Sequence, residues 1–458
     1  MGDTELIAAV RRGDADAVRA LLEEGADADA LDADGLPVLC TAVAAYDDPV
    51  AEALMDGGAD PDRPLPDGTT PLLRAVDLGS PAIFSTVLGH EPRLRLPEAA
   101  RERLLTLART WYATGAAEEL RRRTGATGPA ERVRVQDDEY HHVDQVTLGG
   151  LTVRAGHGAV LTSLEWAFRV LPPVEELVAR GLKYADEDHV DWWSAKWILS
   201  QRRSKETWLA VTAFRHHPDP AHRRFVLDFL RIRSLTGASD RNSYDKEESR
   251  LFAAWAAEET DVDVLAKVLD AFVGYEHPGM QSIGLGYVGH PDPRVRREVP
   301  ALLTTWGNPY PPPTPPARAA LLRLARDPDS EVRAGAGYWL GTCHDLTLEV
   351  HQTLIALTRD PDPEVRTRTA GALAASPDRT SAAADALVAL LDEEDVQARL
   401  NAAYGLVLRD DPRTEEATGR VGPLGPGFEH DHRDSAIRRW KWERKKTERE
   451  KGSATTEQ

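Results

Sequence analysis

Hydrophobic and small residues recur every 33 positions over the first 95 residues of the chain. The clearest column is Leu6, Leu39 and Leu72, and three more columns keep its register: Ala9/Ala42/Ala75, Val10/Val43/Val76 and Leu21/Leu54/Val87. A period of this length indicates a repeat architecture. Paired aliphatic residues at 21–22, 54–55 and 87–88 supply the buried stripe of a helix. Each unit is therefore predicted to be a helix, a short turn, a second helix and a loop.

Glycines recur within each 33-residue unit at the end of the second helix and in the tight turn of the loop. Gly25 and Gly58 follow the second helix of their units, where a left-handed residue ends a helix. Asp-Gly pairs at 34–35 and 67–68 supply the tight turn that begins the next unit.

These units resemble the ankyrin repeat, whose Thr-Pro-Leu motif stands at Thr70, Pro71 and Leu72. The second unit departs from the motif, with Pro37 and Val38 in place of Thr-Pro, and the first unit is a truncated cap. The resemblance implies ligand binding at the hairpin tips and the inner-helix face. The matching positions are Arg11, Arg12, Ala33, Asp34, Leu36, Ala44, Ala45, Pro66, Asp67, Thr69, Asp77 and Leu78. The alternative is that the short array docks only on the rest of its own chain.

A second pattern occupies the C-terminal half, where Asp-Pro or acidic pairs precede a helical run. The copies are HPDPRVRREVPALL, DPDSEVRAGAGYWLG, DPDPEVRTRTAGALAA and the looser DEEDVQARLNAAYGLV. Arg333, Arg366 and Arg399 within them are again 33 residues apart. Asp-Pro ends one helix and begins the next, because proline in the first turn needs no N–H partner. These copies therefore predict stacked helix pairs.

This pattern resembles HEAT repeats of the short kind found in phycobilisome-lyase-type proteins. The resemblance implies a structural ladder of acids and arginines between neighbouring units, at Asp327, Arg333, Asp360, Arg366, Glu393 and Arg399. Weaker copies, such as HPDPAHRRFVLDFL at 217–230, extend the array upstream to about seven units. Residues 234–250 are expected to form a polar loop, and residues 307–317 a proline-rich connector.

The segment between the arrays predicts helix over 98–125 and then the one expected region of strand. Val133 and Val135 alternate with polar residues, and Gly149-Gly150 separates two short β-like runs, which is a hairpin signal. Polar chemistry is densest here, at Asp137, Asp138, Glu139, Tyr140, His141, His142, Asp144 and His157. Adjacent histidines on a strand point to opposite faces, so we expect a polar loop or exposed strand. A metal or catalytic site in this segment is the alternative.

Charge and composition narrow the possible functions. The formal net charge is −19, and Cys40 and Cys343 are the only cysteines, which argues against a disulfide framework and cysteine metal knuckles. Residues 1–96 hold 19 Asp/Glu and 7 Arg/Lys, a net charge of −12, whereas residues 433–451 hold 9 Arg/Lys and 4 Asp/Glu, a net charge of +5. The acidic head favours a basic partner, and the basic tail is the one part suited to polyanions.

Motifs of known chemistry are missing from the sequence. It contains no phosphate-binding loop, GxSxG or HExxH pattern, so we expect no catalytic residues, no metal and no cofactor. HEAT-like DNA glycosylases use aromatic side chains on a basic face. Here the tryptophans at 192, 193, 197, 208, 255, 306 and 339 are expected in the core, with a base-stacking platform as the alternative.

The sequence therefore predicts a mostly α protein: ankyrin repeats at 1–95, a connector with helices and a β-hairpin at 96–169, a HEAT-like α-solenoid at 170–410, and a flexible basic tail at 411–458. Solenoids expose long binding surfaces, so the predicted function is a non-enzymatic protein-interaction scaffold. The alternative is a HEAT-type nucleic-acid-binding or DNA-repair protein. No membrane span is expected, the Arg- and Ala-rich composition is typical of bacterial chains, and the protein is expected in the cytoplasm.

Overall fold

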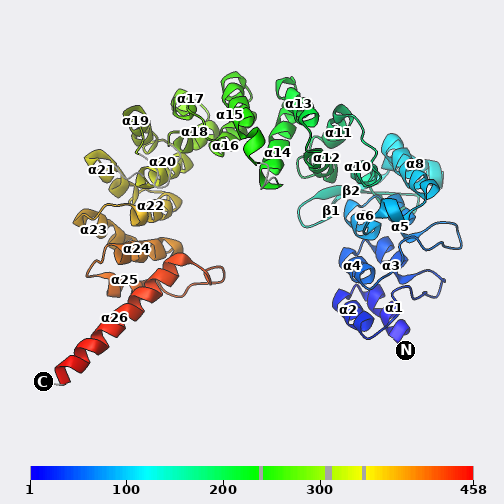
Figure 1. Cartoon of the computed structure of the whole chain (residues 1–458), viewed down its shortest axis with the longest axis horizontal. Coiled ribbons are helices and arrows are strands. Elements are labelled where there is room, and N and C mark those ends of the chain that lie inside the picture. Colours follow the sequence, from blue (N-terminus) through cyan, green and yellow to red (C-terminus); the bar gives the residue numbers. More distant parts are fainter. Residues whose placement is uncertain (1, 237–240, 305–311, 343–346, 457–458) are drawn as a thin grey trace. The chain divides into compact units, whose positions relative to one another are not determined.

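A computed structural model describes residues 2–236, 241–304, 312–342 and 347–456. The chain divides into two compact units, Met1–Ala238 and Ser239–Gln458, and each is described by itself (Figure 1). Both consist of stacked helices, and the first also holds a small three-stranded sheet, which confirms the predicted fold class. Among the described residues, we find no helix with the length and apolar character that a membrane span requires.

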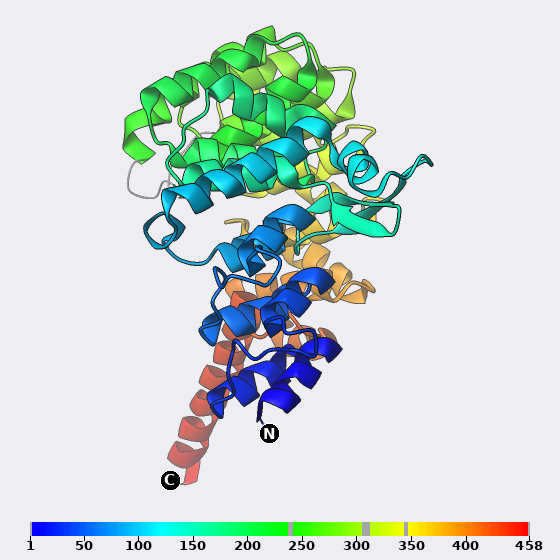
Figure 2. The ribbon, with the colours of Figure 1, turned by 90° about the vertical axis from the view of Figure 1, so that its right-hand side faces the viewer.

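The first unit begins with three helix pairs at the predicted positions. They are α1 (Gly2–Arg12) with α2 (Ala15–Glu23), α3 (Val38–Ala45) with α4 (Asp48–Asp56), and α5 (Pro71–Leu78) with α6 (Pro81–Leu88). The first helices of the pairs pack in one row and the second helices in another, as the stacked blue helices of Figure 2 show. The columns Leu6/Leu39/Leu72 and Ala9/Ala42/Ala75 are fully or almost fully buried between them. Small residues at these positions let the helices approach closely.

Backbone conformation explains the glycine positions in this array. Gly35 and Gly68 at the hairpin tips both have φ of +75°, and Gly25 and Gly58 after the second helices have φ of +94° and +90°. Residues with a side chain rarely adopt this region. Thr70 caps α5, because its hydroxyl accepts a hydrogen bond from the N–H of Leu73 at 3.1 Å.

The connector contains four helices and the sheet. The helices are α7 (Pro92–Arg95), α8 (Glu98–Thr114), α9 (Ala116–Thr124) and α10 (His157–Ala167), and the strands are β1 (Glu131–Gln136), β2 (His142–Leu148) and β3 (Leu151–Arg154). The strands are antiparallel in the order β1-β2-β3. Leu148 pairs with Leu151 across Gly149-Gly150, whose φ angles of +61° and +84° give the predicted two-residue hairpin. Helix α8 packs on α5, and α10 packs on α6 and α8.

Two further helix pairs complete the first unit. They are α11 (Val174–Gly181) with α12 (Val190–Gln201), and α13 (Lys205–Ala213) with α14 (Pro220–Thr236), with the short 3₁₀ turns η1 (Leu182–Tyr184) and η2 (Phe214–His216) after their first helices. Helices α10, α12 and α14 pack in a row.

The described part of the second unit contains five helix pairs, also with their second helices in a row. The pairs are α15 (Arg241–Glu258) with α16 (Val262–Val273), α17 (Met280–Tyr287) with α18 (Pro293–Leu302), α19 (Pro315–Leu324) with α20 (Ser330–Thr342), α21 (Leu348–Leu357) with α22 (Pro363–Ala375), and α23 (Ser381–Ala389) with α24 (Val396–Leu408). The 3₁₀ turn η3 (Leu390–Asp392) joins the last pair.

The expectation of a polar loop over 234–250 is wrong for its second half. Residues 241–250 form the first turns of α15, because Leu251, Phe252 and Trp255 further along bury one face of that helix and extend it backward. The proline-rich connector at 307–317 lies partly outside the described residues, and α19 begins within it at Pro315.

Helices also occupy the stretch expected as a flexible tail. They are α25 (Thr414–Arg420) and α26 (His432–Thr456). The first turns of α26 pack on α24, where Ile437 is buried and Arg433 donates to the side-chain oxygen of Asn401 at 2.6 Å. This contact covers the end of the last helix pair, as terminal caps do in repeat proteins.

Candidate protein-interaction surface

The hairpin tips of the ankyrin array present acidic side chains to solvent. In the second tip, Asp67 accepts hydrogen bonds from the N–H and the hydroxyl of Thr69 at 2.9 and 2.6 Å, and its other oxygen pairs with Arg74 at 3.0 Å. These hydrogen bonds, those from Thr69 foremost, lower the pKa of Asp67 to about 2. In the first tip, Asp34 is exposed. Both tips therefore offer negative charge to a partner.

The ends of the first helices beside these tips are exposed to solvent. Ala44 and Ala45 at the end of α3 are exposed, as are Arg11 and Arg12 at the end of α1. Ala33 and Pro66 in the tips are exposed too, and Leu36 is half-buried. Most of the positions implied by the ankyrin resemblance are thus accessible to a ligand.

Asp77 and Leu78 differ, because Asp77 contacts the connector and Leu78 is half-buried. Asp77 accepts a hydrogen bond from the indole N–H of Trp111 at 2.7 Å and pairs with Arg123 at 2.7 Å. The ring of His157 stacks on Trp111 with centroids 4.5 Å apart, and its Nε2 lies 3.2 Å from the Asp77 carbonyl oxygen. Burial lowers the pKa of His157 to about 4. The end of α5 is therefore an internal junction as well as a border of the candidate surface.

A pocket of about 630 Å³ lies between the second hairpin tip, α5, α8 and α9. Its apolar lining includes Leu73, Ala99 and Leu107, and polar residues surround them: Thr69, Arg74, Asp77, Glu102, Arg103, Thr106, Thr110, Glu119, Arg122 and Arg123. A concave apolar surface with a few polar groups is the usual form of a binding site.

Ion pairs fix most of the charged groups around this pocket. Glu119 is buried and accepts hydrogen bonds from Arg122 at 2.6 Å and Arg123 at 2.8 Å, which together outweigh burial and lower its pKa to about 2, the bond from Arg122 most. Arg103 instead donates to the Gly68 carbonyl oxygen at 2.7 Å. No carboxylate of the described chain lies within ion-pair distance of Arg103, so its guanidinium can still bind an acceptor on a ligand.

The sequence did not lead us to predict that the connector lines this pocket, although the 33-residue period contained a signal for it. Leu105 and Ala108 stand 33 positions after Leu72 and Ala75, and both are buried. Helix α8 therefore packs on α5 as a fourth inner helix would. The helix that carries Arg103 and Leu107 was predicted within 98–125, and extending the columns by one period would also have predicted that it packs on the third inner helix.

The polar segment at 137–157 also serves the junction. Asp137 is buried and accepts hydrogen bonds from the Ser80 hydroxyl at 2.6 Å, the Ala82 N–H at 2.9 Å and Arg154 at 2.8 Å, so it caps α6. His141 binds Asp138 at 2.9 Å. Over the described stretches of chain, no three His, Cys, Asp or Glu side chains come together in a way that could hold a metal ion.

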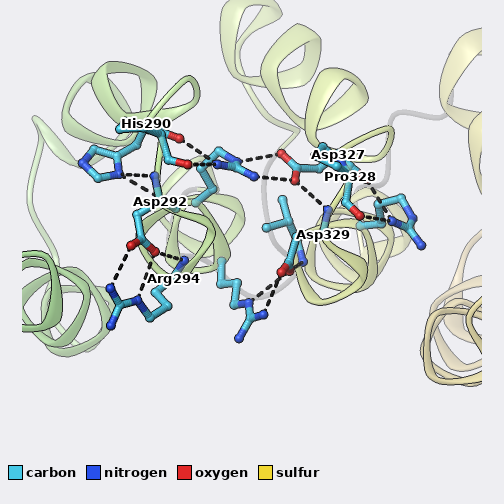
Figure 3. Close-up of polar contacts among 11 residues, drawn as sticks. His290, Asp292, Arg294, Asp327, Pro328 and Asp329 are labelled. Carbon is cyan, nitrogen blue, oxygen red and sulfur yellow. Dashed lines mark hydrogen bonds and ion pairs between the residues drawn. The ribbon is translucent and has the colours of Figure 1, made fainter.

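In the second unit, arginines link each helix pair to the next (Figure 3). Arg333 makes two hydrogen bonds of 2.8 Å to Asp360, and Arg366 binds Glu393 in the same way at 2.8 and 2.7 Å. Arg296 likewise binds Asp327 with two bonds of 2.8 Å, so each acid receives the arginine of the preceding unit.

Within its own unit, each arginine binds the backbone at the start of its helix. The Nη1 of Arg333 donates to the carbonyl oxygens of Asp327 and Pro328, six and five residues earlier, at 2.9 and 3.1 Å. Asp327 lies six residues before Arg333, and Asp360 lies six residues before Arg366; in both cases the arginine donates a hydrogen bond to the backbone carbonyl oxygen of that acid. In the first unit, Arg223 makes the same two bonds to His217 and Pro218 at 2.8 and 3.0 Å, and thus HPDPAHRRFVLDFL folds like the later copies.

The last arginine ends the ladder differently. The Nε of Arg399 donates to the Val421 carbonyl oxygen at 3.0 Å, and its Nη1 donates to the Glu393 carbonyl oxygen at 2.6 Å. The segment after α25 therefore takes the place of the next acid.

Comparisons with known proteins identify both repeat types. A model of ankyrin repeats, three copies, matches residues 6–95, and a model of HEAT repeats matches residues 318–407. The chain thus has ankyrin repeats near its N-terminus and HEAT repeats in its C-terminal half.

Three solved structures are similar to this chain at low identity. The Escherichia coli protein YibA is 14% identical, with 59% of this chain and 93% of that chain covered and a TM-score of 0.42. Cex1p is 16% identical, with 65% and 64% covered and a TM-score of 0.31. An engineered protein is 15% identical, with 96% and 97% covered and a TM-score of 0.26. No curated protein sequence matches the chain.

Proposed function

We propose that this protein is a non-enzymatic interaction scaffold that binds another protein through the inner face of its ankyrin repeats. The observation that supports the proposal most is the pocket of about 630 Å³ next to the exposed tip at Asp67. Ankyrin and HEAT repeats are typical protein-interaction modules. The acidic tips favour a partner with a basic surface, and Arg103 would donate a hydrogen bond to a carbonyl or carboxylate oxygen of that partner.

The test is affinity capture of the full chain from its native cell with crosslinking and quantitative mass spectrometry. The variant Ala45→Arg adds a long cation to the exposed end of α3 without disturbing the core. The matched control is Leu348→Arg on α21, where the side chain is 72% exposed. We expect at least one protein to be depleted about ten-fold by Ala45→Arg and kept by the control. If every captured protein is indifferent to Ala45→Arg, the ankyrin face is not the binding surface.

The nucleic-acid alternative rests on the exposed part of α26. Arg438, Arg439 and Lys441 are exposed there, and Trp442 is 63% exposed. An electrophoretic mobility assay at moderate salt separates the two functions. The scaffold predicts no shift of duplex or single-stranded DNA, whereas a shift that Arg439→Glu abolishes would favour nucleic-acid binding.

Several finer assignments belong to the same proposal. We divide the chain functionally at 1–95, 96–169, 170–410 and 411–458, and infer HEAT repeats of the phycobilisome-lyase-like type in a bacterial, cytoplasmic protein. Arg296, Arg333 and Arg366 make the same bonds in successive units, which supports this repeat type. We infer a structural role for these arginines.

A further inference from the structure

Four aromatic rings form a continuous stripe on the surface of the first unit, away from the ankyrin pocket. Tyr140 and His141 come from the turn between β1 and β2, and Trp193 and Trp197 come from α12, which lies beside this hairpin in Figure 1. Successive ring centroids are 6.3 Å apart from Tyr140 to His141, 4.8 Å from His141 to Trp193, and 5.8 Å from Trp193 to Trp197. We call these four residues the aromatic stripe.

The two ends of the stripe are exposed and its His141 side chain is 13% exposed, although the sequence placed its tryptophans in the core. Trp192, Trp208 and Trp255 are buried as predicted, but Trp197 is 37% exposed and Tyr140 is 70% exposed. Residues 192 and 193 are adjacent on α12 and thus point in directions about 100° apart, so only one of them reaches the core. An exposed run of aromatic rings is a binding feature rather than a packing requirement.

Carboxylates surround the stripe at close range. Asp138 lies 2.9 Å from the His141 ring nitrogen, and a hydrogen bond with Glu139 raises the pKa of the Tyr140 hydroxyl. At the other end, Lys196 lies 5.2 Å from the centre of the Trp193 ring and is held by Asp228 at 3.2 Å.

The loop before α12 adds further acids. The His142 N–H donates to the Asp188 carbonyl oxygen at 2.9 Å, which holds the loop with the three consecutive acids 186–188 against the hairpin. Two of them have arginine partners, Asp186 with Arg134 at 2.8 Å and Glu187 with Arg224 at 2.7 Å. Across the hairpin, this loop, α12 and α14, the acids named here (Asp138, Glu139, Asp186, Glu187, Asp188 and Asp228) outnumber the named bases (Arg134, Lys196 and Arg224) by six to three, a net charge of −3.

This combination distinguishes between the ligands that aromatic surfaces take. Single-stranded nucleic acid also stacks on aromatic rings, but it needs cations along its phosphates, and here carboxylates would repel them. A guanidinium group instead stacks on an indole face and pairs with carboxylates through its planar fork. The surface therefore fits arginine better than a nucleotide.

We propose that the aromatic stripe and its acids bind an extended segment of a partner protein that carries arginines at alternate positions. In an extended chain, side chains two residues apart are about 6.6 Å apart, close to the spacing of the rings. Each arginine stacks on an indole or phenol ring and pairs with a carboxylate at the edge of the stripe. This proposal extends the scaffold function to a second surface, separate from the ankyrin pocket.

Fluorescence anisotropy of a labelled Gly/Ser peptide with three alternate arginines, titrated with the full chain, tests the proposal. We expect saturable binding that weakens about five-fold in Trp197→Ala and in Tyr140→Ala. Trp442→Ala, which removes an exposed tryptophan from α26, is the matched control and should change affinity less than two-fold. Tyr140→Ala guards against a folding defect, since that side chain is largely exposed.

Peptide chemistry provides the second part of the test. Citrulline in place of arginine keeps the shape but removes the charge and should abolish binding, and lysine should bind more weakly than arginine. Glu139→Gln should also weaken binding. The proposal is overturned if the arginine peptide does not bind, if Trp197→Ala and Trp442→Ala behave alike, or if a single-stranded oligonucleotide binds in a Trp197-dependent way.

The scaffold proposal and this one fail separately. Ala45→Arg should not affect the peptide, and Trp197→Ala should not affect a partner of the ankyrin pocket. If Ala45→Arg weakens binding of the arginine peptide, the peptide binds the ankyrin face. That result would overturn the proposal for the aromatic stripe.

Discussion

The two repeat arrays share a 33-residue period but join their units by different chemistry. In the ankyrin array, neighbouring units meet through apolar columns and single bonds at the loops, such as that from the Asp60 N–H to Asp29 at 3.0 Å. In the second unit, neighbours are joined by paired hydrogen bonds between an arginine and an acid, such as Arg333 and Asp360, with side chains only 14% and 7% exposed.

This difference gives the acidic residues different roles in the two arrays. A carboxylate that receives a bidentate guanidinium is already neutralised, so the ladder adds stability and contributes little charge to the surface. Several ankyrin acids, such as Asp29 and Asp32, instead bind backbone N–H groups and keep their charge, whereas Asp67 also pairs with Arg74. The same residue type therefore supports packing between units in one array and, under the proposed function, is available for recognition in the other.

The largest effect is expected from breaking the ladder. Arg333→Ala removes the bonds to Asp360 and to two carbonyl groups, and it leaves the buried Asp360 carboxylate without its guanidinium partner and with the bond from the Asp362 N–H. We expect the free energy of unfolding of this array to fall by about 3–5 kcal/mol, measured by urea denaturation and by hydrogen exchange in α20 and α22. Arg368→Ala is the control, because Arg368 is 45% exposed and pairs only with exposed acids; a loss under about 1 kcal/mol is expected. Equal losses would show that the ladder is no stronger than surface pairs.

The next effect tests the ankyrin junction, which depends on close backbone approach. A Cβ atom on Gly79, where φ is +71°, would lie 2.1 Å from the Arg154 carbonyl oxygen and 2.3 Å from the His157 ring. We expect Gly79→Ala to cost about 2–3 kcal/mol in thermal or urea unfolding. Gly68→Ala has a similar φ of +75° but meets no atom within 4 Å, so it should cost only about 1 kcal/mol. A similar cost for both would assign the effect to φ alone.

The third prediction concerns pH, where two acids respond in opposite directions. Burial raises the pKa of Asp191 to about 7, although the hydrogen bond from the Ala159 N–H opposes the rise. The folded state therefore holds a proton that the unfolded chain releases, and stability falls as the pH rises from about 4 to about 7. Asp191→Asn should remove this loss, up to about 1.4 kcal/mol per pH unit, and raise the melting temperature at pH 7.5 more than at pH 5.

For the ladder acid Asp360, burial raises the pKa, but the bonds from Arg333 and from the Asp362 N–H outweigh it and hold the pKa below its usual value. Its contribution is present above the unfolded pKa and is lost as the pH falls through the folded value. Asp360→Asn should therefore destabilise the protein at pH 7 and matter less in acid. A profile that Asp191→Asn does not alter would contradict the burial argument.

The smallest effect is expected at an ankyrin loop. Asp29→Ala removes the acceptor for the Asp60 N–H, which solvent can replace at this exposed edge. A loss of about 0.5–1 kcal/mol is expected in urea denaturation. Asp16→Ala removes an acid with a 97% exposed side chain and should have no measurable effect. A loss at Asp29 as large as that of Arg333→Ala would remove the distinction between the arrays.

Repeated local patterns made much of the fold predictable. The helix pairs of the ankyrin array, the Gly149-Gly150 hairpin and the Asp-Pro helix starts all follow from residues close together in sequence. The prediction of a polar loop over 234–250 was wrong from Arg241 onward. The polar residues there form the start of α15, because the buried apolar face later in that helix stabilises it. The tryptophans of α12 were assigned to the core as a group, but Trp192 is buried whereas Trp197 is 37% exposed, because the two lie on different faces of the helix.

The sequence by itself determined the two repeat types, their period, and the residues that turn or begin each helix, because these depend on spacing and backbone preference. Only the tertiary structure decided which acid each ladder arginine binds, since Arg333 reaches Asp360 across 27 positions of chain. It also decided that Asp77 and Asp137 serve a junction, that α8 and α9 complete the ankyrin pocket, and that Tyr140 meets Trp193 through His141. Contacts of this kind depend on how far and in which direction packed elements bring distant side chains together, and no local pattern records that.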